Sequence, residues 1–173
     1  MFVKSEQSLA ASMAKGMRLG LAALILGIAA SGCKQSNIPN TDVPDNQPNR
    51  DVVYFVERYR RAVEKRDVGA LISLASPKYY DDNGTPSGKD DLDFHRLQEH
   101  LTQWREAILD VRYEMRYRRV SFEKGKILVD YTYTASFRIS APEGERWARR
   151  VADNRLTLVR NHASKSFFIL SGM

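Results

Sequence analysis

The stretch ILVDYTYTASFRI, residues 127–139, decides the fold of this chain. Its odd-numbered positions are all apolar or aromatic, while its even-numbered positions are mostly polar or charged. A period of two places alternate side chains on opposite faces of a β-strand. The stretch is therefore predicted to be a long strand whose Tyr131 and Tyr133 face a core.

Strands with the same period are predicted on both sides of this stretch. Residues 109–118 alternate apolar and charged side chains, and a Glu-Lys-Gly-Lys turn follows at 123–126. A Pro-Glu-Gly turn at 142–144 leads to a third strand over about 146–160. A last strand spans about 166–170.

The third strand contains a change of pattern. Its apolar residues move from odd positions, at Trp147 and Val151, to even positions, at Leu156 and Leu158. An extra residue in one strand would restore a single inward face across such a change. We therefore expect a β-bulge near Asp153-Asn154.

Three helices are predicted before the strands. Apolar residues at three- and four-residue steps indicate an amphipathic helix over 51–65, with its first aspartate as N-cap. Asp67 is the predicted N-cap of a short second helix, which Pro77 ends. A turn-rich loop at 81–88 precedes a third helix over about 90–107, whose acidic first turn suits the helix dipole.

Helices followed by long antiparallel strands predict an α+β domain, in which three N-terminal helices pack in a strongly curved antiparallel sheet. This order resembles the nuclear transport factor 2-like superfamily, a cone-like fold shared with ketosteroid isomerase, scytalone dehydratase and polyketide cyclases. The residues that carry the resemblance are the first helix, Arg66-Asp67 with Leu71 and Leu74, Tyr80-Asp81, Gly88, and the closing hairpin 156–160 with 167–170. It covers about 51–173.

The resemblance does not assign a catalytic residue. Enzymes of this fold place an acidic residue or a His–Asp pair inside the cone, and no such motif can be matched to this chain residue by residue. One fold serves many functions, so the activity has to be argued from the site.

Residues 1–32 have the pattern of an export signal. Basic residues precede a 12-residue apolar run at 19–30, which is shorter than the roughly 20 residues of a membrane-spanning helix. The sequence Ala-Ser-Gly-Cys at 30–33 resembles the lipobox of bacterial lipoproteins. That resemblance implies cleavage before Cys33 and a diacylglycerol on its sulfur. The alternative is a plain secretory signal followed by an incidental cysteine.

The domain organisation follows from this signal. Residues 33–50 are predicted to be the lipidated cysteine and a flexible tether, because this segment has three prolines, four asparagines and few apolar residues. Residues 51–173 form the folded domain. By resemblance to sorting in enteric bacteria, Lys34 favours the outer membrane, with the domain facing the periplasm.

Composition excludes several kinds of chemistry. A single cysteine rules out an internal disulfide and a multi-cysteine zinc site. The acidic loop that starts at Asp81 has Leu92 at its twelfth position, where a calcium loop has a bidentate Glu. No glycine-rich phosphate loop and no G-x-S-x-G motif occurs. We expect neither metal nor cofactor.

Charge does not predict nucleic-acid binding. Removal of the signal lowers the formal net charge from +6 to +4, and an exported protein meets little nucleic acid. Seven arginines fall on strands predicted to be adjacent, and they could face anionic lipid headgroups or an acidic partner. The alternative is a solvated face with scattered acids. The seven are Arg112, Arg116, Arg118, Arg119, Arg149, Arg150 and Arg155.

Three residues are candidates for acid–base chemistry. Asp93 and His95 could act together if a pocket held both, but residues i and i+2 do not share a helix face. A capping acid and a solvated histidine are the alternative. Asp130 is the only acid inside the long strand; buried, its pKa would be raised and would indicate a function. Its alternative role is pairing with an arginine on the outer face.

A row of aromatic residues could line a ligand cavity, with tyrosine hydroxyls as its polar groups. Packing of an ordinary core is the alternative. The row consists of Tyr113, Tyr117, Tyr131, Tyr133, Phe137 and Trp147.

These features favour a cell-envelope lipoprotein with a non-catalytic domain that binds a ligand or a protein. The expected partners are a membrane, through the N-terminal lipid, a second copy, through the sheet, and a small apolar molecule. The alternative is an enzyme of the isomerase, dehydratase or cyclase type.

Overall fold

A computed structural model describes residues 36–86, 88–164 and 166–173. The predicted signal peptide and Cys33 lie outside the described residues. The helices and strands are α2 (Gln47–Glu64), α3 (Val68–Leu74), β1 (Tyr80–Asp81), β2 (Leu92–Asp93), α4 (Phe94–Ala107), β3 (Ile108–Glu123), β4 (Lys126–Ala141), β5 (Gly144–Asn161) and β6 (Ser166–Ser171).

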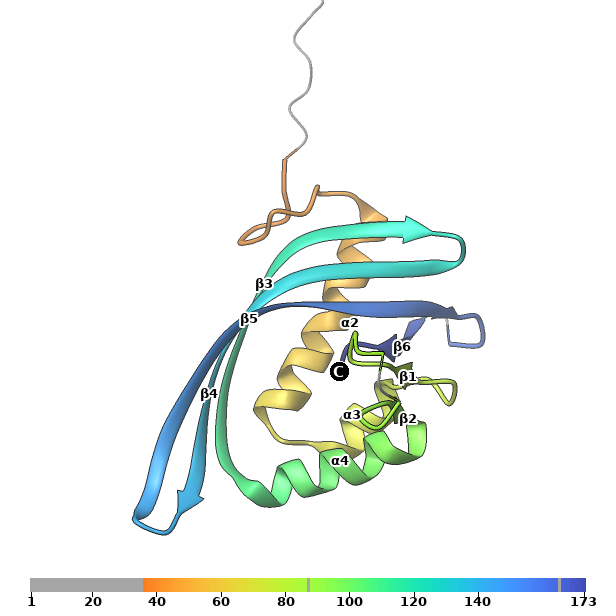
Figure 1. The fold of residues 1–173 in the computed structure, drawn as a ribbon. Coiled ribbons are helices and arrows are strands. Elements are labelled where there is room, and N and C mark those ends of the chain that lie inside the picture. Colours follow the sequence, from red (N-terminus) through yellow and green to blue (C-terminus); the bar gives the residue numbers. More distant parts are fainter. Residues whose placement is uncertain (1–35, 87, 165) are drawn as a thin grey trace, which may run out of the picture. The chain divides into compact units, whose positions relative to one another are not determined.

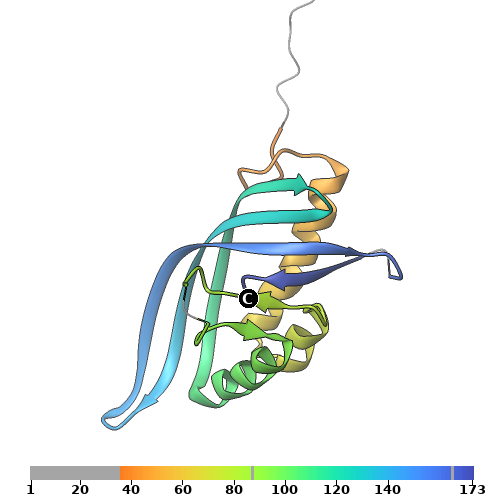
Figure 2. The same ribbon diagram turned by 45° about the vertical axis from the view of Figure 1, so that its right-hand side comes forward.

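The long strands form one antiparallel sheet in the order β3-β4-β5-β6, and β1 pairs with β2 in a separate ribbon. Within the folded domain, β3, β4 and β5 bend strongly, and the helices lie on the concave side of the bend (Figures 1 and 2). The predicted α+β class, with three helices inside a curved antiparallel sheet, is confirmed.

The expected bulge near Asp153-Asn154 is wrong. β4 and β5 pair without interruption from Lys126↔Val159 to Ala141↔Gly144. The apolar pattern changes because Trp147 lies on the convex face and is 47% exposed, whereas Leu156 lies on the concave face and is buried. Irregular pairing occurs elsewhere, at two places in β3 and between β5 and β6.

The predicted tether is corrected for residues 36–50. Val43 is fully buried, and the backbone N–H of Asp42 donates to the carbonyl oxygen of Tyr117, 3.0 Å away. The side chain of Asn46 accepts from the N–H of Asn49 at 3.0 Å, so Asn46, and not Asp51, is the N-cap of α2. Proline and asparagine are typical of caps and turns as well as of tethers, and composition alone does not separate these uses.

Two further helix starts are set by aspartates. Asp67 caps α3 by accepting from the N–H of Ala70 at 2.9 Å, as predicted. Asp93 caps α4 by accepting from the N–H of Arg96 at 2.8 Å. α4 therefore starts four residues later than the sequence predicted, because 92–93 pairs as a strand with 80–81.

One side of the concave face is closed by α2 and β6. Its side chains pack in a continuous core, and seven of them are at most 3% exposed: Val52, Val56, Ile127, Val129, Leu156, Leu158 and Ile169. None of the described helices is long and apolar enough to cross a membrane.

Candidate functional site

A pocket of about 200 Å³ lies between the helices and the other side of the concave face. Its lining comes from each of the three described helices, from three strands and from the last residue: Tyr59, Val63, Leu71, Leu97, His100, Leu101, Trp104, Tyr113, Tyr133, Phe137, Asn154 and Met173. Most of these side chains are apolar or aromatic, and the polar groups are few, which is the usual composition of a small-molecule site.

The lining follows from local periodicity. Tyr133 and Phe137 are at odd positions of β4, and this parity places them on the concave face. On α4, Leu97, Leu101 and Trp104 are spaced by four and three residues, which puts them on one face of the helix. Leu97 is buried, whereas Leu101 and Trp104 are half-buried and partly exposed to solvent.

Three buried tyrosines form a cluster at the inner wall of the pocket: Tyr59 and Tyr113 line it, and Tyr131 lies in the adjoining core. The Tyr131 hydroxyl accepts from Asn154 Nδ2 at 3.1 Å. Burial raises the pKa of Tyr131 to about 12 and raises the pKa of Tyr59 and Tyr113 well above the usual tyrosine value. The three hydroxyls are therefore protonated at neutral pH and available as hydrogen-bond donors.

The last two residues are held against the pocket by a polar clamp. The N–H of Gly172 donates to Asp81 Oδ2 at 2.6 Å, and the N–H of Met173 donates to the Tyr79 hydroxyl oxygen at 3.2 Å. Asn154 Nδ2 donates to the carbonyl oxygen of Gly172 at 3.2 Å. These bonds fix the position from which the Met173 side chain lines the pocket.

Only glycine fits at position 172. Its φ is +92°, and a Cβ atom there would lie 1.9 Å from the carbonyl oxygen of Arg155. A van der Waals contact needs more than 3 Å, so any side chain would force the end of the chain away from β5. The orientation of Met173 therefore depends on this glycine.

The six residues of the aromatic row lie in three different places in the structure. Tyr113, Tyr133 and Phe137 line the pocket, while Tyr117 and Tyr131 are buried in the adjoining core. Trp147 was wrongly expected in this row. It lies on the convex face, where the guanidinium of Arg112 sits 4.9 Å from its ring centroid.

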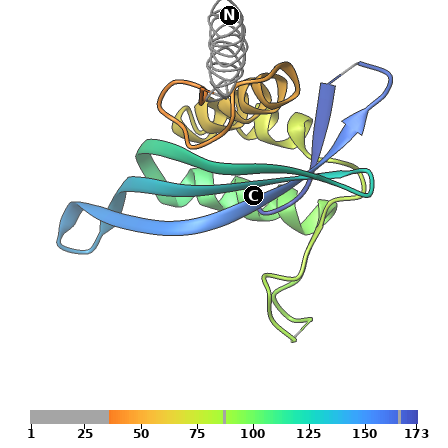
Figure 3. The ribbon, with the colours of Figure 1, turned by 90° about the horizontal axis from the view of Figure 1, so that it is seen from above.

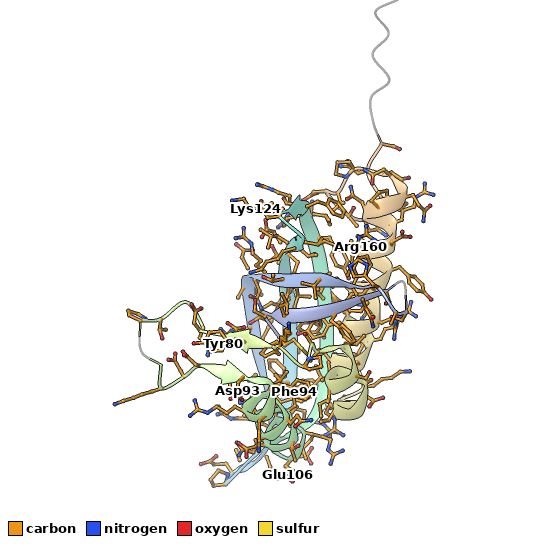
Figure 4. The ribbon with its side chains drawn as sticks, turned by 90° about the vertical axis from the view of Figure 1, so that its right-hand side faces the viewer. Tyr80, Asp93, Phe94, Glu106, Lys124 and Arg160 are labelled. Atoms are coloured by element: carbon orange, nitrogen blue, oxygen red, sulfur yellow. The ribbon has the colours of Figure 1, made fainter. Side chains whose placement is uncertain are left out.

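The three acid–base candidates do not line the pocket. Asp93 acts as the helix cap at the start of α4 (Figure 4). The His95 side chain is 79% exposed, with its Nδ1 3.6 Å from Glu99 Oε1. Asp130 lies on the convex face and accepts from Arg155 Nε at 2.6 Å.

The convex face carries ion pairs and not an unbalanced cationic surface. Arg116 and Arg118 each contact Asp42 at 3.0 Å, and Asp130 is 4.0 Å from Arg119 Nε. Arg150 is the exception among the seven arginines, because its pairing with Ala135 places it on the concave face. The alternative of a solvated face with scattered acids describes the other six.

Several pocket residues could not be assigned from the sequence. Leu97, Leu101 and Trp104 gave an apolar helical pattern, but nothing in the spacing indicated that a cavity would remain beside them. Asn154 and Met173 carried no signal, because their place depends on how β5 and the end of the chain pack. Within the described ranges, no group of three or more His, Cys, Asp or Glu side chains could hold a metal ion.

No protein-family model matches the chain, and no curated protein matches it. Solved structures do match. A protein from Streptomyces avermitilis, described as a dehydratase of the nuclear transport factor 2-like family, has 13% identity and a TM-score of 0.59, covering 72% of this chain and 92% of its own.

Two further structures agree. A ketosteroid isomerase-like protein from Erwinia carotovora atroseptica has 15% identity and a TM-score of 0.56, covering 73% of this chain and 93% of its own. A protein from Xanthomonas campestris, described as a calcium/calmodulin dependent protein kinase II association domain, has 13% identity and a TM-score of 0.57, covering 80% and 90%. At such identities the likeness concerns the fold alone: the domain has the nuclear transport factor 2-like cone fold.

Proposed function

We propose that the domain is a non-catalytic binding module of the cell envelope, which holds one small and mainly apolar molecule in the cone. The pocket between α4 and the sheet carries this proposal. Aliphatic and aromatic side chains make most of its wall, and protonated tyrosine hydroxyls with one amide supply its polar contacts.

The size and polarity of the pocket define the ligand class. About 200 Å³ is less than the roughly 300–1,000 Å³ of pockets for drug-sized molecules, so a single ring or a short branched chain fits best. An uncharged hydroxyl or carbonyl group on that molecule could be bonded by the Tyr113 hydroxyl, and a ligand hydroxyl could also donate to Asn154 Oδ1. A carboxylate or an ammonium group would lose its hydration without gaining an opposite charge from the described lining.

Binding is favoured over acid–base catalysis by the same residues. His100 is the one histidine in the described lining, which contains no aspartate or glutamate, and it is exposed at the margin. Burial keeps the tyrosines protonated, so they can donate a hydrogen bond but have no tendency to accept a proton. An isomerase or dehydratase needs a base and an acid in reach of one substrate.

The two tryptophans allow a direct test, because Trp104 lines the pocket while Trp147 lies on the convex face. In a Trp147→Phe protein, Trp104 is the sole reporter. Cyclohexanol is a suitable probe, since it has an apolar ring, one hydroxyl and no ultraviolet absorption. We expect a saturable blue shift of the Trp104 emission, whereas the Trp104→Phe protein should show no saturable change.

A pair of α4 variants controls for unspecific effects. Leu101→Arg places a charge in the pocket wall and should weaken cyclohexanol binding by about tenfold or more. Gln103→Arg adds the same charge at an exposed position of the same helix and should leave binding unchanged. Equal affinity in the two variants, or no saturation in the parent protein, would contradict the proposed function.

We also propose that Cys33 is acylated and anchors the protein to the membrane. Two or more acyl chains give stable anchoring, since each buried methylene contributes about 0.8 kcal/mol. The Cys33→Ser protein should move from the membrane fraction to the soluble fraction. Unchanged membrane retention would contradict the anchor without affecting the pocket.

A further inference from the structure

The folded domain begins only a few residues after the proposed anchor in the sequence. Ser36 is the first described residue, three positions after Cys33, and it is exposed. Its carbonyl oxygen accepts from the N–H of Asp45 at 2.7 Å, which places it beside the start of α2. Three extended residues span at most about 10 Å. An acylated Cys33 therefore requires this end of the domain to lie next to the bilayer.

The turn between β3 and β4 lies at the same end. Figures 1 and 2 show segment 36–46, the start of α2 and this turn together at one end of the domain, opposite α4. Figure 3 looks onto that end and shows all three in front. Lys124, in the turn, is seen at this end in Figure 4, and Glu106 of α4 is seen at the other end.

Basic and aromatic side chains surround a recess at this turn. The recess has a volume of about 430 Å³, and the members of its lining that matter here are Phe122, Lys124, Lys126, Arg160 and His162, which we call the basic end. Phe122 is 48% exposed although it is one of the large apolar residues. An exposed aromatic ring among cations is typical of surfaces that contact lipid headgroups.

The acids near the basic end do not cancel its charge. Glu123 is the one acid in the described lining of the recess. Asp42 is neutralised by Arg116 and Arg118, and Asp45 by Arg50. Asp51, one turn into α2, accepts a hydrogen bond from Gln47. Within the described part of the chain, no ion pair engages Lys124 or Lys126.

The next turn of the same sheet differs in charge. Glu143 lies in the turn between β4 and β5, where the turn between β3 and β4 has Lys124. Glu145, at the start of β5, pairs with Arg138 Nη1 at 2.8 Å and does not add to the charge of this turn. An anionic surface attracts the Lys124 turn and repels the Glu143 turn.

We propose that the basic end rests on the surface of an anionic phospholipid bilayer, with Phe122 at the headgroup level and the Glu143 turn between β4 and β5 directed away from it. This inference rests on the proposed acylation of Cys33. It gives the domain one orientation, in which α4 and its side of the pocket face the aqueous compartment. A ligand then enters from water and does not have to leave the bilayer.

The orientation can be measured on the full chain, produced in a bacterium that acylates it and checked by mass spectrometry. Cys33 is the only cysteine, so its acylation leaves an introduced cysteine as the single reactive thiol. A fluorophore is attached in Lys124→Cys or in Glu143→Cys. Each protein is reconstituted into vesicles of phosphatidylethanolamine and phosphatidylglycerol that contain a headgroup quencher.

We expect strong quenching at position 124 and little at position 143. Addition of Lys126→Glu and Arg160→Glu, or omission of phosphatidylglycerol, should reduce the quenching at 124 at least twofold. The control pair Arg146→Glu and Arg149→Glu changes the charge equally at the other end of β5 and should have no effect. If the acylated protein shows equal quenching at positions 124 and 143, or more at 143, the proposed orientation is wrong while the anchor stands. If the mass of the purified protein shows no attached lipid, the anchor and the orientation are both wrong.

Discussion

The concave face has two sides that share the same strands but differ in how their side chains are covered. The closed side is the one that packs against α2 and β6, and the open side is the one that lines the pocket. On the closed side, β4 and β5 contribute Val129, Leu156 and Leu158, which have no measurable exposure. On the open side, the same strands contribute Phe137 and Ala152, which are only half-buried. The alternation of side chains is identical along the whole length, since the register of β4 and β5 is continuous.

The difference comes from what covers each side. β6 pairs with β5 only from Thr157 onward, so the first half of β5 is an unpaired edge. α2 packs across the closed side, whereas α4 meets the open side at an angle (Figure 2). The pocket lies between α4 and the sheet. Strand periodicity thus decides which face points inward, and the surrounding elements decide whether that face becomes core or binding site.

The largest expected effect is a difference in the free energy of unfolding between variants of the two sides. Leu156→Ala on the closed side should lower the free energy of unfolding by about 2–5 kcal/mol, because it leaves a cavity in a filled core. Phe137→Ala on the open side should cost about 1–2 kcal/mol, since part of the ring already contacts solvent. Urea unfolding measures both. Equal losses would mean that the open side is ordinary core.

Unfolding at alkaline pH tests the burial of the tyrosine cluster that lies between the closed and the open side. Burial raises the pKa of Tyr131 to about 12, above the value of about 10 in an unfolded chain. Its stabilising contribution is therefore complete below pH 10 and is lost as pH rises toward 12, by about 2–3 kcal/mol. Tyrosinate absorbance from the cluster should appear only with unfolding, and its appearance in folded protein would contradict the burial.

Two glycines test the clamp at the end of the chain. Gly172→Ala should lower the free energy of unfolding by about 2 kcal/mol, from an unfavourable φ and a clash with β5. It should also alter cyclohexanol binding, because Met173 moves. Gly125 has φ +83° but no atom within 4 Å of its missing Cβ. Gly125→Ala should therefore cost about 1 kcal/mol and leave binding unchanged; identical effects on binding would show that the clamp does not shape the pocket.

The smallest expected change in stability comes from the ion pairs of Asp42, in the segment before α2. Hydrogen bonds from Arg116 and Arg118 lower the pKa of the Asp42 carboxyl. A lowered carboxyl pKa stabilises the fold above the unfolded value of about 3.9 and loses that contribution as pH falls further. Asp42→Asn should slightly lower the melting temperature at neutral pH, while at the lowest pH the two proteins should melt alike. A constant difference across this range would exclude the ion pairs as its cause.

Much of this architecture could be predicted from the sequence because it depends on local pattern. The period of two from Ile127 to Ile139 and the cap at Asp67 are read within a few residues of chain. Trp147 was misplaced because an apolar residue was assumed to face inward, whereas an exposed tryptophan can stack with an arginine on the convex face.

The pocket depended on contacts between distant parts of the chain. Asn154 and Met173 reach it only because β5 bends and Gly172 bonds to Asp81, which is 91 residues away in sequence. The role of segment 36–46 was missed for a similar reason, since Val43 becomes buried only against elements that follow it. Spacing cannot predict such contacts, because they are set by tertiary packing.

Occupancy of the cone is tested most directly by amide and indole NMR spectra of the protein titrated with cyclohexanol. If the open side is a binding site, saturable shifts should occur at the Trp104 indole and at the amides of Tyr133, Phe137 and Asn154, while the Trp147 indole stays unchanged. Shifts that do not saturate, or that are largest at Trp147 on the convex face, would contradict a ligand site in the cone.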